Sequence, residues 1–325
     1  MKSTVRKIIT LIACITAAAH ADTPSTLPLA GTWRFALDRG NVGESERWFD
    51  RNLAEKIELP GSCEQRGFGD PPAVPEERRL TRVLKYTGPA WYQRDIQVPA
   101  GWSGKRVELF LERCHWETPV WIGGRKIGMQ NSLSTPHQHD LGVLSPGKHT
   151  LTVCVDNSYK LKIGVWAHAI TEDTQTNWNG IIGAIELRAT DPVWIRSAQV
   201  FPGKIRVNVG NQTGKEQVGK IAGSDVTIPA GGGELEIPFT PAVTEKWDEF
   251  SPVTHTMDLN LTAGTFSDTL QVPYALRDLA VKDKQFVLNG RPVFMRGPVD
   301  ECVDPLTGYP PTDKASWMRV LGICK

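Results

Sequence analysis

The residues best suited to carrying chemistry stand in one short polar and aromatic run. In residues 174–183, which read TQTNWNGIIG, Asn177 and Asn179 flank Trp178. Each side-chain amide offers donors and an acceptor, a set that suits neighbouring hydroxyl groups on a sugar. The indole offers a flat apolar face to a pyranose ring. A polar run ahead of a strand is also typical of an ordinary turn, so the pattern leaves a sugar contact and a structural role open.

Two histidines form a second candidate. His137 and His139 alternate along an expected strand, which could place both imidazoles on one face as a pair of metal ligands. A tetrahedral site needs three or four ligands, and no third ligand stands near this pair in the sequence. No Ser/His/Asp order, phosphate-binding loop or dinucleotide fingerprint is present either. We therefore predict no metal, no cofactor and no catalytic residue in this part of the chain.

Both candidates lie in a part of the sequence whose pattern is mainly that of β-strands. Residues 22–190 alternate short strand-like runs with Gly and Pro turns, and residues 106–112 place Val107, Leu109 and Leu111 on one face. Many short strands with this punctuation predict a two-sheet sandwich, and the length suits a jelly roll. Residues 191–278 hold about six further alternating runs, which predicts an immunoglobulin-like sandwich.

The tail, residues 279–325, has a different pattern. Asn289-Gly290 predicts a tight two-residue turn that leads into a short strand at residues 292–296. Thr312 is a candidate helix N-cap. An apolar stripe at helical spacing follows it, made of Trp317, Val320, Leu321 and Cys324. A strand, a loop and a helix in this order predict one βα unit. We expect that no sheet packs against the apolar stripe of its helix.

Composition excludes several kinds of partner. The chain has 37 basic and 36 acidic side chains among 325 residues, so no net field attracts nucleic acid. Residues 1–21 combine a basic start, an apolar run and a small-residue cleavage site, which predicts a signal peptide and export, with no membrane span. Cys14 resembles a lipoprotein acylation site and stays an alternative. The mature chain keeps an odd number of widely spaced cysteines, which indicates no disulfide framework: Cys63, Cys114, Cys154, Cys302 and Cys324.

Several motifs together resemble one known family. The tail motif FVLNGRPVFMRG at residues 286–297 looks like the entry to the catalytic β/α barrel of glycoside hydrolase family 2, and PLTGYPPTD at 305–313 is similar to a β-galactosidase-like branch. The front half is similar to the sugar-binding domain of that family through WYQRDIQVPAGW at 91–102, VWIGGRKIG at 120–128 and PHQHDL at 136–141. The resemblance covers nearly the whole mature chain.

The resemblance implies roles for particular residues. Family 2 enzymes take two catalytic glutamates from later barrel strands, which this chain does not contain. The loop with Asn177, Trp178 and Asn179 then points toward the barrel mouth and meets the sugar. Asp300 and Glu301 follow the first barrel strand, where such barrels contact substrate, although paired loop acids are also commonly only solvated.

We therefore expect the non-catalytic N-terminal part of an exported exo-β-glycosidase that binds a terminal β-linked sugar. The alternatives are a stand-alone carbohydrate-binding protein without hydrolase activity, and a scaffold module without sugar affinity. The sequence indicates neither which sugar is bound nor the oligomeric state.

Overall fold

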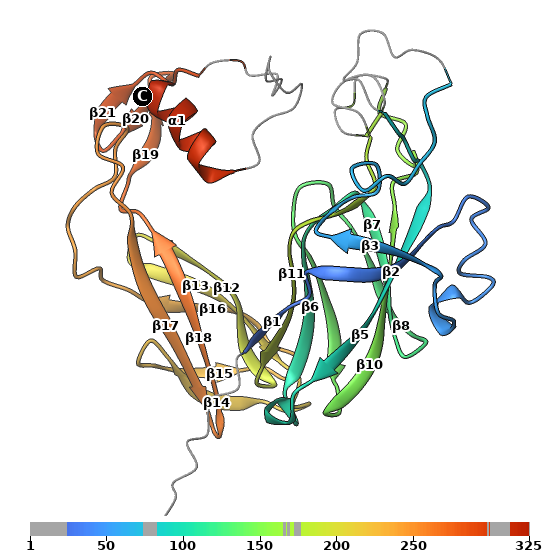
Figure 1. Ribbon diagram of the computed structural model, residues 1–325. Helices are drawn as coiled ribbons and strands as arrows, with labels where there is room; N and C mark the ends of the chain where they lie inside the picture. The colour runs from blue at the N-terminus through green and yellow to red at the C-terminus, as the bar shows by residue number, and fades with distance from the viewer. Residues whose placement is uncertain are drawn as a thin grey trace, which may run out of the picture.

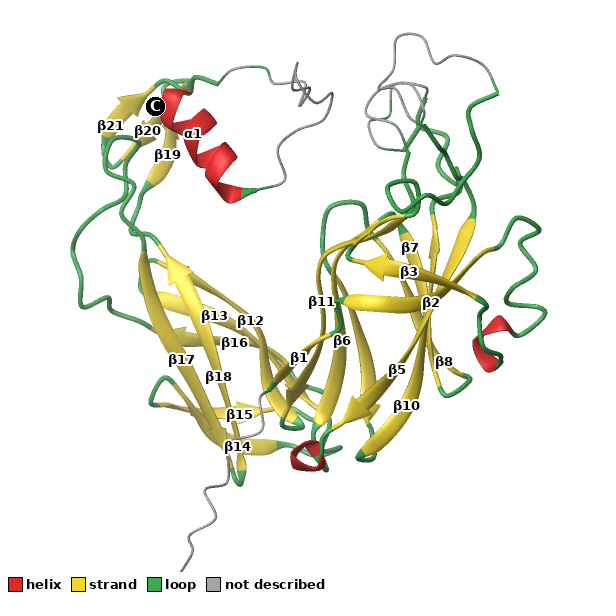
Figure 2. Ribbon diagram, viewed as in Figure 1, coloured by secondary structure: helices red, strands yellow, loops and turns green. Residues whose placement is uncertain are grey.

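The computed structural model describes residues 25–73, 83–164, 167, 170–171, 177–297, 299 and 313–324. Within these ranges the chain is built of β-strands, with a single α-helix, α1 (Lys314–Cys324), near the C-terminus (Figure 2). The prediction of a mainly β protein is confirmed. The expected signal peptide lies outside the described residues and stays a prediction.

The first sandwich contains eleven strands and two short 3-10 helices. The strands are β1 (Thr26–Pro28), β2 (Gly31–Leu37), β3 (Glu55–Leu59), β4 (Gly61–Ser62), β5 (Pro89–Val98), β6 (Arg106–Cys114), β7 (Glu117–Ile122), β8 (Arg125–Asn131), β9 (His137–Val143), β10 (Gly147–Asp156) and β11 (Gly180–Thr190); the 3-10 helices are η1 (Trp48–Asp50) and η2 (Ala100–Trp102). One antiparallel sheet has the order β1-β11-β6-β9, with β4 paired to β11, and the other has the order β3-β2-β5-β10-β7-β8 (Figure 1).

Strand alternation builds the core between these two sheets. Along β6, Val107, Leu109 and Leu111 are fully buried, while Glu108 and Phe110 point to the outer face of the sheet. This is the face assignment that the alternating pattern predicted. Apolar side chains from both sheets join in one cluster, and a second, smaller cluster on the outer face of the β5-β10-β7 sheet packs Trp91, Trp121 and Cys154 against Phe49 of η1 and Leu53.

The second sandwich has seven strands. They are β12 (Val193–Phe201), β13 (Lys204–Asn211), β14 (Gln217–Ile221), β15 (Ser224–Ile228), β16 (Gly233–Pro238), β17 (His255–Ala263) and β18 (Phe266–Tyr274). They form sheets of order β12-β13-β16 and β15-β14-β17-β18 around a separate apolar core. Seven strands split as three and four are typical of an immunoglobulin-like unit, as expected.

A small antiparallel sheet follows the second sandwich, with the order β19 (Leu279–Lys282), β20 (Gln285–Leu288), β21 (Arg291–Val293). Asn289 and Gly290 have φ values of 51° and 82°, so they form the tight turn that the sequence predicted. The strand expected at residues 292–296 is shorter: β21 ends at Val293 and pairs antiparallel with β20. The expected βα unit requires a strand that pairs in parallel with a neighbour. In the described tail, β21 pairs only with β20, its antiparallel hairpin partner.

The helix α1 has no buried residue. In the predicted apolar stripe, Leu321 is 58% exposed and Val320 is 37% exposed, while Trp317 is partly buried. The predicted N-cap Thr312 lies outside the described residues.

Candidate functional site

Three buried asparagines meet at one end of the first sandwich. Asn157 follows β10 of one sheet, and Asn177 and Asn179 precede β11 of the other, so the packing of the two sheets brings together residues far apart in the sequence. Each of the three side chains is at most 1% exposed. A buried amide must find hydrogen-bond partners inside the protein, which makes the contacts of these three groups decisive for their role.

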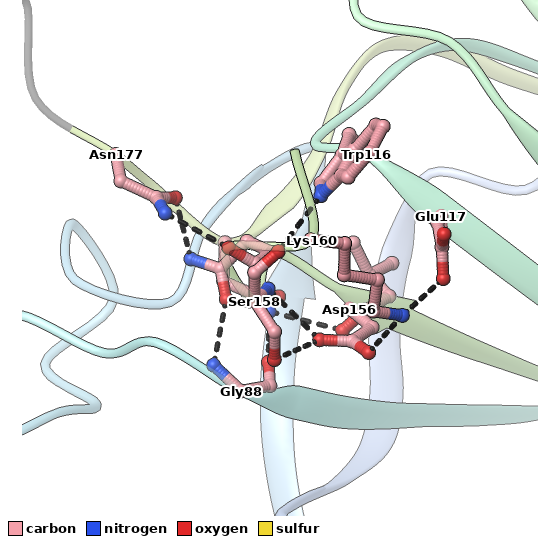
Figure 3. Close-up of polar contacts among 10 residues, drawn as sticks. Gly88, Trp116, Glu117, Asp156, Ser158, Lys160 and Asn177 are labelled. Carbon is pink, nitrogen blue, oxygen red and sulfur yellow. Dashed lines mark hydrogen bonds and ion pairs between the residues drawn. The ribbon is translucent and has the colours of Figure 1, made fainter. Parts of the chain in front are cut away.

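Asn157 joins two segments of chain. Its Oδ1 accepts a hydrogen bond from the backbone N–H of Gly88 at 2.8 Å. Its Nδ2 donates to the carbonyl oxygen of Tyr86 at 2.9 Å and to Oδ1 of Asn177 at 2.8 Å (Figure 3). The segment that enters β5 is therefore tied to the loop that enters β11.

Asn179 continues this network into the core. Its Nδ2 donates to the carbonyl oxygens of Gly88 at 2.9 Å and Val155 at 3.0 Å, and its Oδ1 accepts from the Tyr92 hydroxyl at 3.1 Å. The Tyr92 hydroxyl also lies 2.9 Å from Sγ of Cys63. Burial raises the pKa of both the Cys63 thiol and the Tyr92 phenol, so neither group ionises near neutral pH. These contacts hold the fold together and do not make a nucleophile.

Asn177 is also turned inward. Its Nδ2 donates to the carbonyl oxygens of Asn157 at 2.8 Å and Ile170 at 3.3 Å. The described contacts thus give Asn177 and Asn179 a structural role, because their amide groups bind other parts of the loop and the strand ends. That either residue also binds a sugar stays a prediction.

Trp178, between them, has a different environment. It is partly exposed, and its ring stacks on the ring of His115 with centroids 5.1 Å apart and planes 28° apart. Nδ1 of His115 lies 2.7 Å from the carbonyl oxygen of Trp178; a carbonyl only accepts, so Nδ1–H is the donor. The indole is therefore held at a fixed angle while part of its surface stays open, as a sugar-stacking residue requires.

Two charged residues that the sequence reasoning missed also belong to this end of the sandwich. The carboxylate of Glu64 accepts from the backbone N–H of Asn179, with N···O distances of 3.3 and 3.4 Å. Lys160 pairs with Glu117 and, at 2.7 Å, with Asp156 (Figure 3). Neither residue lies in a recognisable motif, and only the spacing of four residues between Asp156 and Lys160 could have pointed to their ion pair.

The Lys160 pair is ionised despite its partial burial. Burial alone raises the pKa of Asp156, but hydrogen bonds from Lys160 and Ser158 outweigh it, and the net pKa is lowered. For Lys160, burial lowers the pKa, while Asp156 and Glu117 raise it by more. The pair fixes the start of the loop that carries Asn177 to Asn179.

Comparison with known proteins assigns the family. The model of the sugar-binding domain of glycosyl hydrolases family 2 matches residues 27–190, which is just over half of the 325 residues. The chain belongs to glycoside hydrolase family 2. The match ends at the last residue of β11, so the asparagine network and Trp178 lie within the sugar-binding domain of the family.

Curated relatives are similar over both sandwiches. A β-glucuronidase of Paenibacillus borealis is 22% identical over 309 residues, covering 83% of this chain and 48% of the relative. The human β-glucuronidase is 22% identical over 314 residues, covering 83% and 47%. The chain therefore spans about half the length of these relatives.

Solved structures share the fold. A β-glucuronidase from Ruminococcus gnavus in complex with D-glucuronic acid aligns with a TM-score of 0.58 at 17% sequence identity, covering 84% of this chain and 49% of that structure. At this identity the likeness concerns the fold alone.

The histidine pair is internal to this family 2 domain. His137 and His139 are 0% and 3% exposed, and the Thr118 hydroxyl lies between them, 2.6 Å from Nδ1 of His137 and 3.0 Å from Nε2 of His139. Among the residues that the structure describes, no group of three or more His, Cys, Asp or Glu side chains could hold a metal ion. The hydroxyl bridge accounts for the pair as part of the packing.

The other predicted site residues, Asp300 and Glu301, lie outside the described residues, so their contact with substrate stays a prediction.

The described cysteines are all free thiols: Cys63, Cys114, Cys154 and Cys324. In the described part of the chain, no helix is long and apolar enough to span a membrane.

Proposed function

We propose that this chain is the non-catalytic, sugar-facing N-terminal part of an exported exo-β-glycosidase. The observation that carries the proposal is the fixed indole of Trp178 in a family 2 sugar-binding domain. Hydrogen bonds of Asn157, Asn177 and Asn179 hold the two neighbours of Trp178 in place, so little conformational entropy is left to lose at this residue when a sugar binds.

Two features point to different terminal sugars. The PLTGYPPTD motif at residues 305–313 favours a β-galactoside, whereas the curated relatives are β-glucuronidases. We take a β-glucuronide as the first substrate class, because the similarity to those relatives extends over 83% of the chain and the motif over nine residues. β-Galactosides are the second class to test.

The reaction itself belongs to the enzyme that contains residues 1–325. Hydrolysis of a glycosidic bond uses two carboxyl groups, one as general acid and one as nucleophile or base. The family resemblance assigns both to later barrel strands. Asp300 and Glu301 are proposed to contact substrate at the barrel mouth, and the chain's own role is to hold and orient the sugar.

A pair of variants separates sugar binding from folding. In the enzyme that contains this chain, Trp178→Ala is expected to lower kcat/KM on an aryl β-glucuronide about three- to tenfold, because one ring contact contributes about 0.5–1.5 kcal/mol. Its melting temperature should hardly change. Asn179→Ala in the 325-residue chain should lower the free energy of unfolding by about 2–4 kcal/mol, because several buried groups lose a partner.

The matched control is Asn131→Ala, an exposed asparagine at the end of β8, which should change stability by less than about 0.5 kcal/mol. Urea unfolding and steady-state kinetics are the two measurements. Normal kinetics together with a large stability loss for Trp178→Ala would show that the indole is only a packing residue and would contradict the proposal.

Export is a separate prediction. If residues 1–21 are cleaved, the secreted protein begins at Asp22. N-terminal sequencing of the secreted product checks this, and an acylated Cys14 as first residue would replace cleavage with lipid anchoring.

A further inference from the structure

The carboxylate of Glu64 lies against the backbone of the Trp178 loop. Strand β4 pairs antiparallel with β11, and beyond its end the N–H of Cys63 donates to the carbonyl oxygen of Asn179 at 2.7 Å. Glu64 is the next residue. Its two carboxylate oxygens lie 3.3 and 3.4 Å from the backbone nitrogen of Asn179. This nitrogen belongs to the peptide bond between Trp178 and Asn179, so the carboxylate is held beside the residue that carries the indole.

Glu64 and Trp178 are the outward-facing residues of this contact. Their neighbours face the core: Cys63 and Asn179 are buried, and Sγ of Cys63 lies 3.7 Å from Oδ1 of Asn179. Glu64 and Trp178 are both partly exposed. The ring of His115 stacks on one face of the indole, so a ligand can stack only on the other face. A carboxylate and an indole face are thus both accessible at one place in the fold.

The amides that the sequence suggested for sugar binding are used inside the protein. The side chains of Asn177 and Asn179 bond to each other's neighbours, and the carbonyl oxygen of Trp178 accepts from His115. A sugar stacked on the indole still needs polar contacts, because a few placed polar groups fix the orientation of a ligand in its site. The carboxylate of Glu64 is in position to supply one.

The chemistry of a carboxylate suits the hydroxyl groups of a sugar. It only accepts, and its two oxygens offer about four lone-pair positions, so the bond from the Asn179 N–H leaves capacity for hydroxyl donors. A hydrogen bond to a charged acceptor is roughly twice as strong as one between neutral groups. A second carboxylate would be repelled at this place. The hydroxyl-bearing edge of a sugar therefore fits against Glu64, and the carboxylate of a uronic acid does not.

We propose that Glu64 is a sugar-binding residue of the Trp178 loop, whose carboxylate accepts hydrogen bonds from hydroxyls of the sugar that stacks on the indole. The inference rests on the proposed function and adds to it the group that recognises the hydroxyls. It assigns this contact to a residue 115 positions before Asn179 in the sequence, in place of the two asparagines.

The first test is Glu64→Gln in the enzyme that contains residues 1–325. Glutamine keeps the shape of the side chain and an acceptor oxygen for the Asn179 N–H, but it removes the charge. On an aryl β-glucuronide, kcat/KM should fall about tenfold while the melting temperature stays the same. Glu216→Gln, an exposed glutamate between β13 and β14, is the matched control and should change neither quantity.

Deoxy substrates separate sugar binding by Glu64 from a purely structural role. The 2-, 3- and 4-deoxy analogues of the same glucuronide each lack one hydroxyl. For at least one analogue, the loss of kcat/KM relative to the parent substrate should be about three- to tenfold smaller in Glu64→Gln than in wild type, because the variant has less of that bond to lose. A variant in which the loop has only shifted would lower kcat/KM for every substrate by the same factor.

The outcomes distinguish this inference from the proposed function. Equal losses in wild type and Glu64→Gln with every deoxy analogue would overturn the inference, and so would normal kinetics of Glu64→Gln beside a weakened Trp178→Ala. The proposed function would stand in both cases. A coupling between Glu64 and one hydroxyl, together with normal kinetics of Trp178→Ala, would support the role of Glu64 and contradict the role of the indole.

Discussion

At the scale of single residues, the hydrogen bonds of the buried histidine pair allow only one assignment of donors and acceptors. Nε2 of His137 lies 3.0 Å from the carbonyl oxygen of Ser132, so it must donate. Nδ1 of His137 is then the acceptor for the Thr118 hydroxyl, and the Thr118 oxygen accepts from Nε2–H of His139. This chain of bonds requires a neutral His137, because its Nδ1 must be an unprotonated acceptor.

This arrangement predicts a loss of stability in acid. Burial lowers the pKa of His137, and it lowers the pKa of His139 from 6.5 to about 4. Between these two pH values the unfolded chain binds a proton that folded His139 does not. Stability is therefore full above pH 6.5 and falls by about 3 kcal/mol as the pH drops to 4, where the loss levels off.

Urea unfolding at pH 7 and pH 4 checks this prediction on wild type and His139→Leu. Other groups also titrate in this range, so the informative quantity is the difference between the two proteins. The variant should lose about 3 kcal/mol less than wild type on acidification. His149→Leu, on β10 and outside the pair, should retain the wild-type loss. Equal losses in wild type and His139→Leu would show that the pair does not control acid stability.

At the scale of elements, the sequence predicted the strands, the tight turn and the helix, which depend on the pattern of neighbouring residues. The six runs expected in the second sandwich are all strands. β14 was not predicted, because its segment contains Gly219 and Lys220 and buries only Ile221, so alternation is weak there. The hairpin at Asn289-Gly290 and the helix near residue 314 also follow from local signals.

The contacts of the site could not be predicted in this way. The sequence indicated the loop at residues 177–179 but not its partners. Asn179 donates to Gly88, 91 positions away in the sequence, and Asn157 donates to Asn177, 20 positions away. Gly88 and Asn157 border the β5-β10 pair of one sheet, whereas Asn177 and Asn179 precede β11 of the other. Such contacts depend on how the two sheets pack, which residue types alone do not fix.

At the scale of the whole molecule, two sandwiches carry separate cores and meet at a junction of charged and aromatic side chains. The small sheet β19 to β21 and α1 lie at the opposite end of the second sandwich from β14 and β15 (Figure 1). Phe294 is 80% exposed and Ile323 is 77% exposed. The described residues thus form two sandwiches, of which the first is the sugar-binding domain of glycoside hydrolase family 2.

We propose that residues 1–325 bind and orient a sugar without hydrolysing it. The most direct measurement is the hydrolysis of aryl β-glucuronide and aryl β-galactoside by the purified 325-residue chain, against a mock preparation from the same host. We expect no turnover above that blank with either substrate. Turnover above the blank would contradict it, and would mean that carboxylates within this chain, Asp300 and Glu301 first, form an active site of their own.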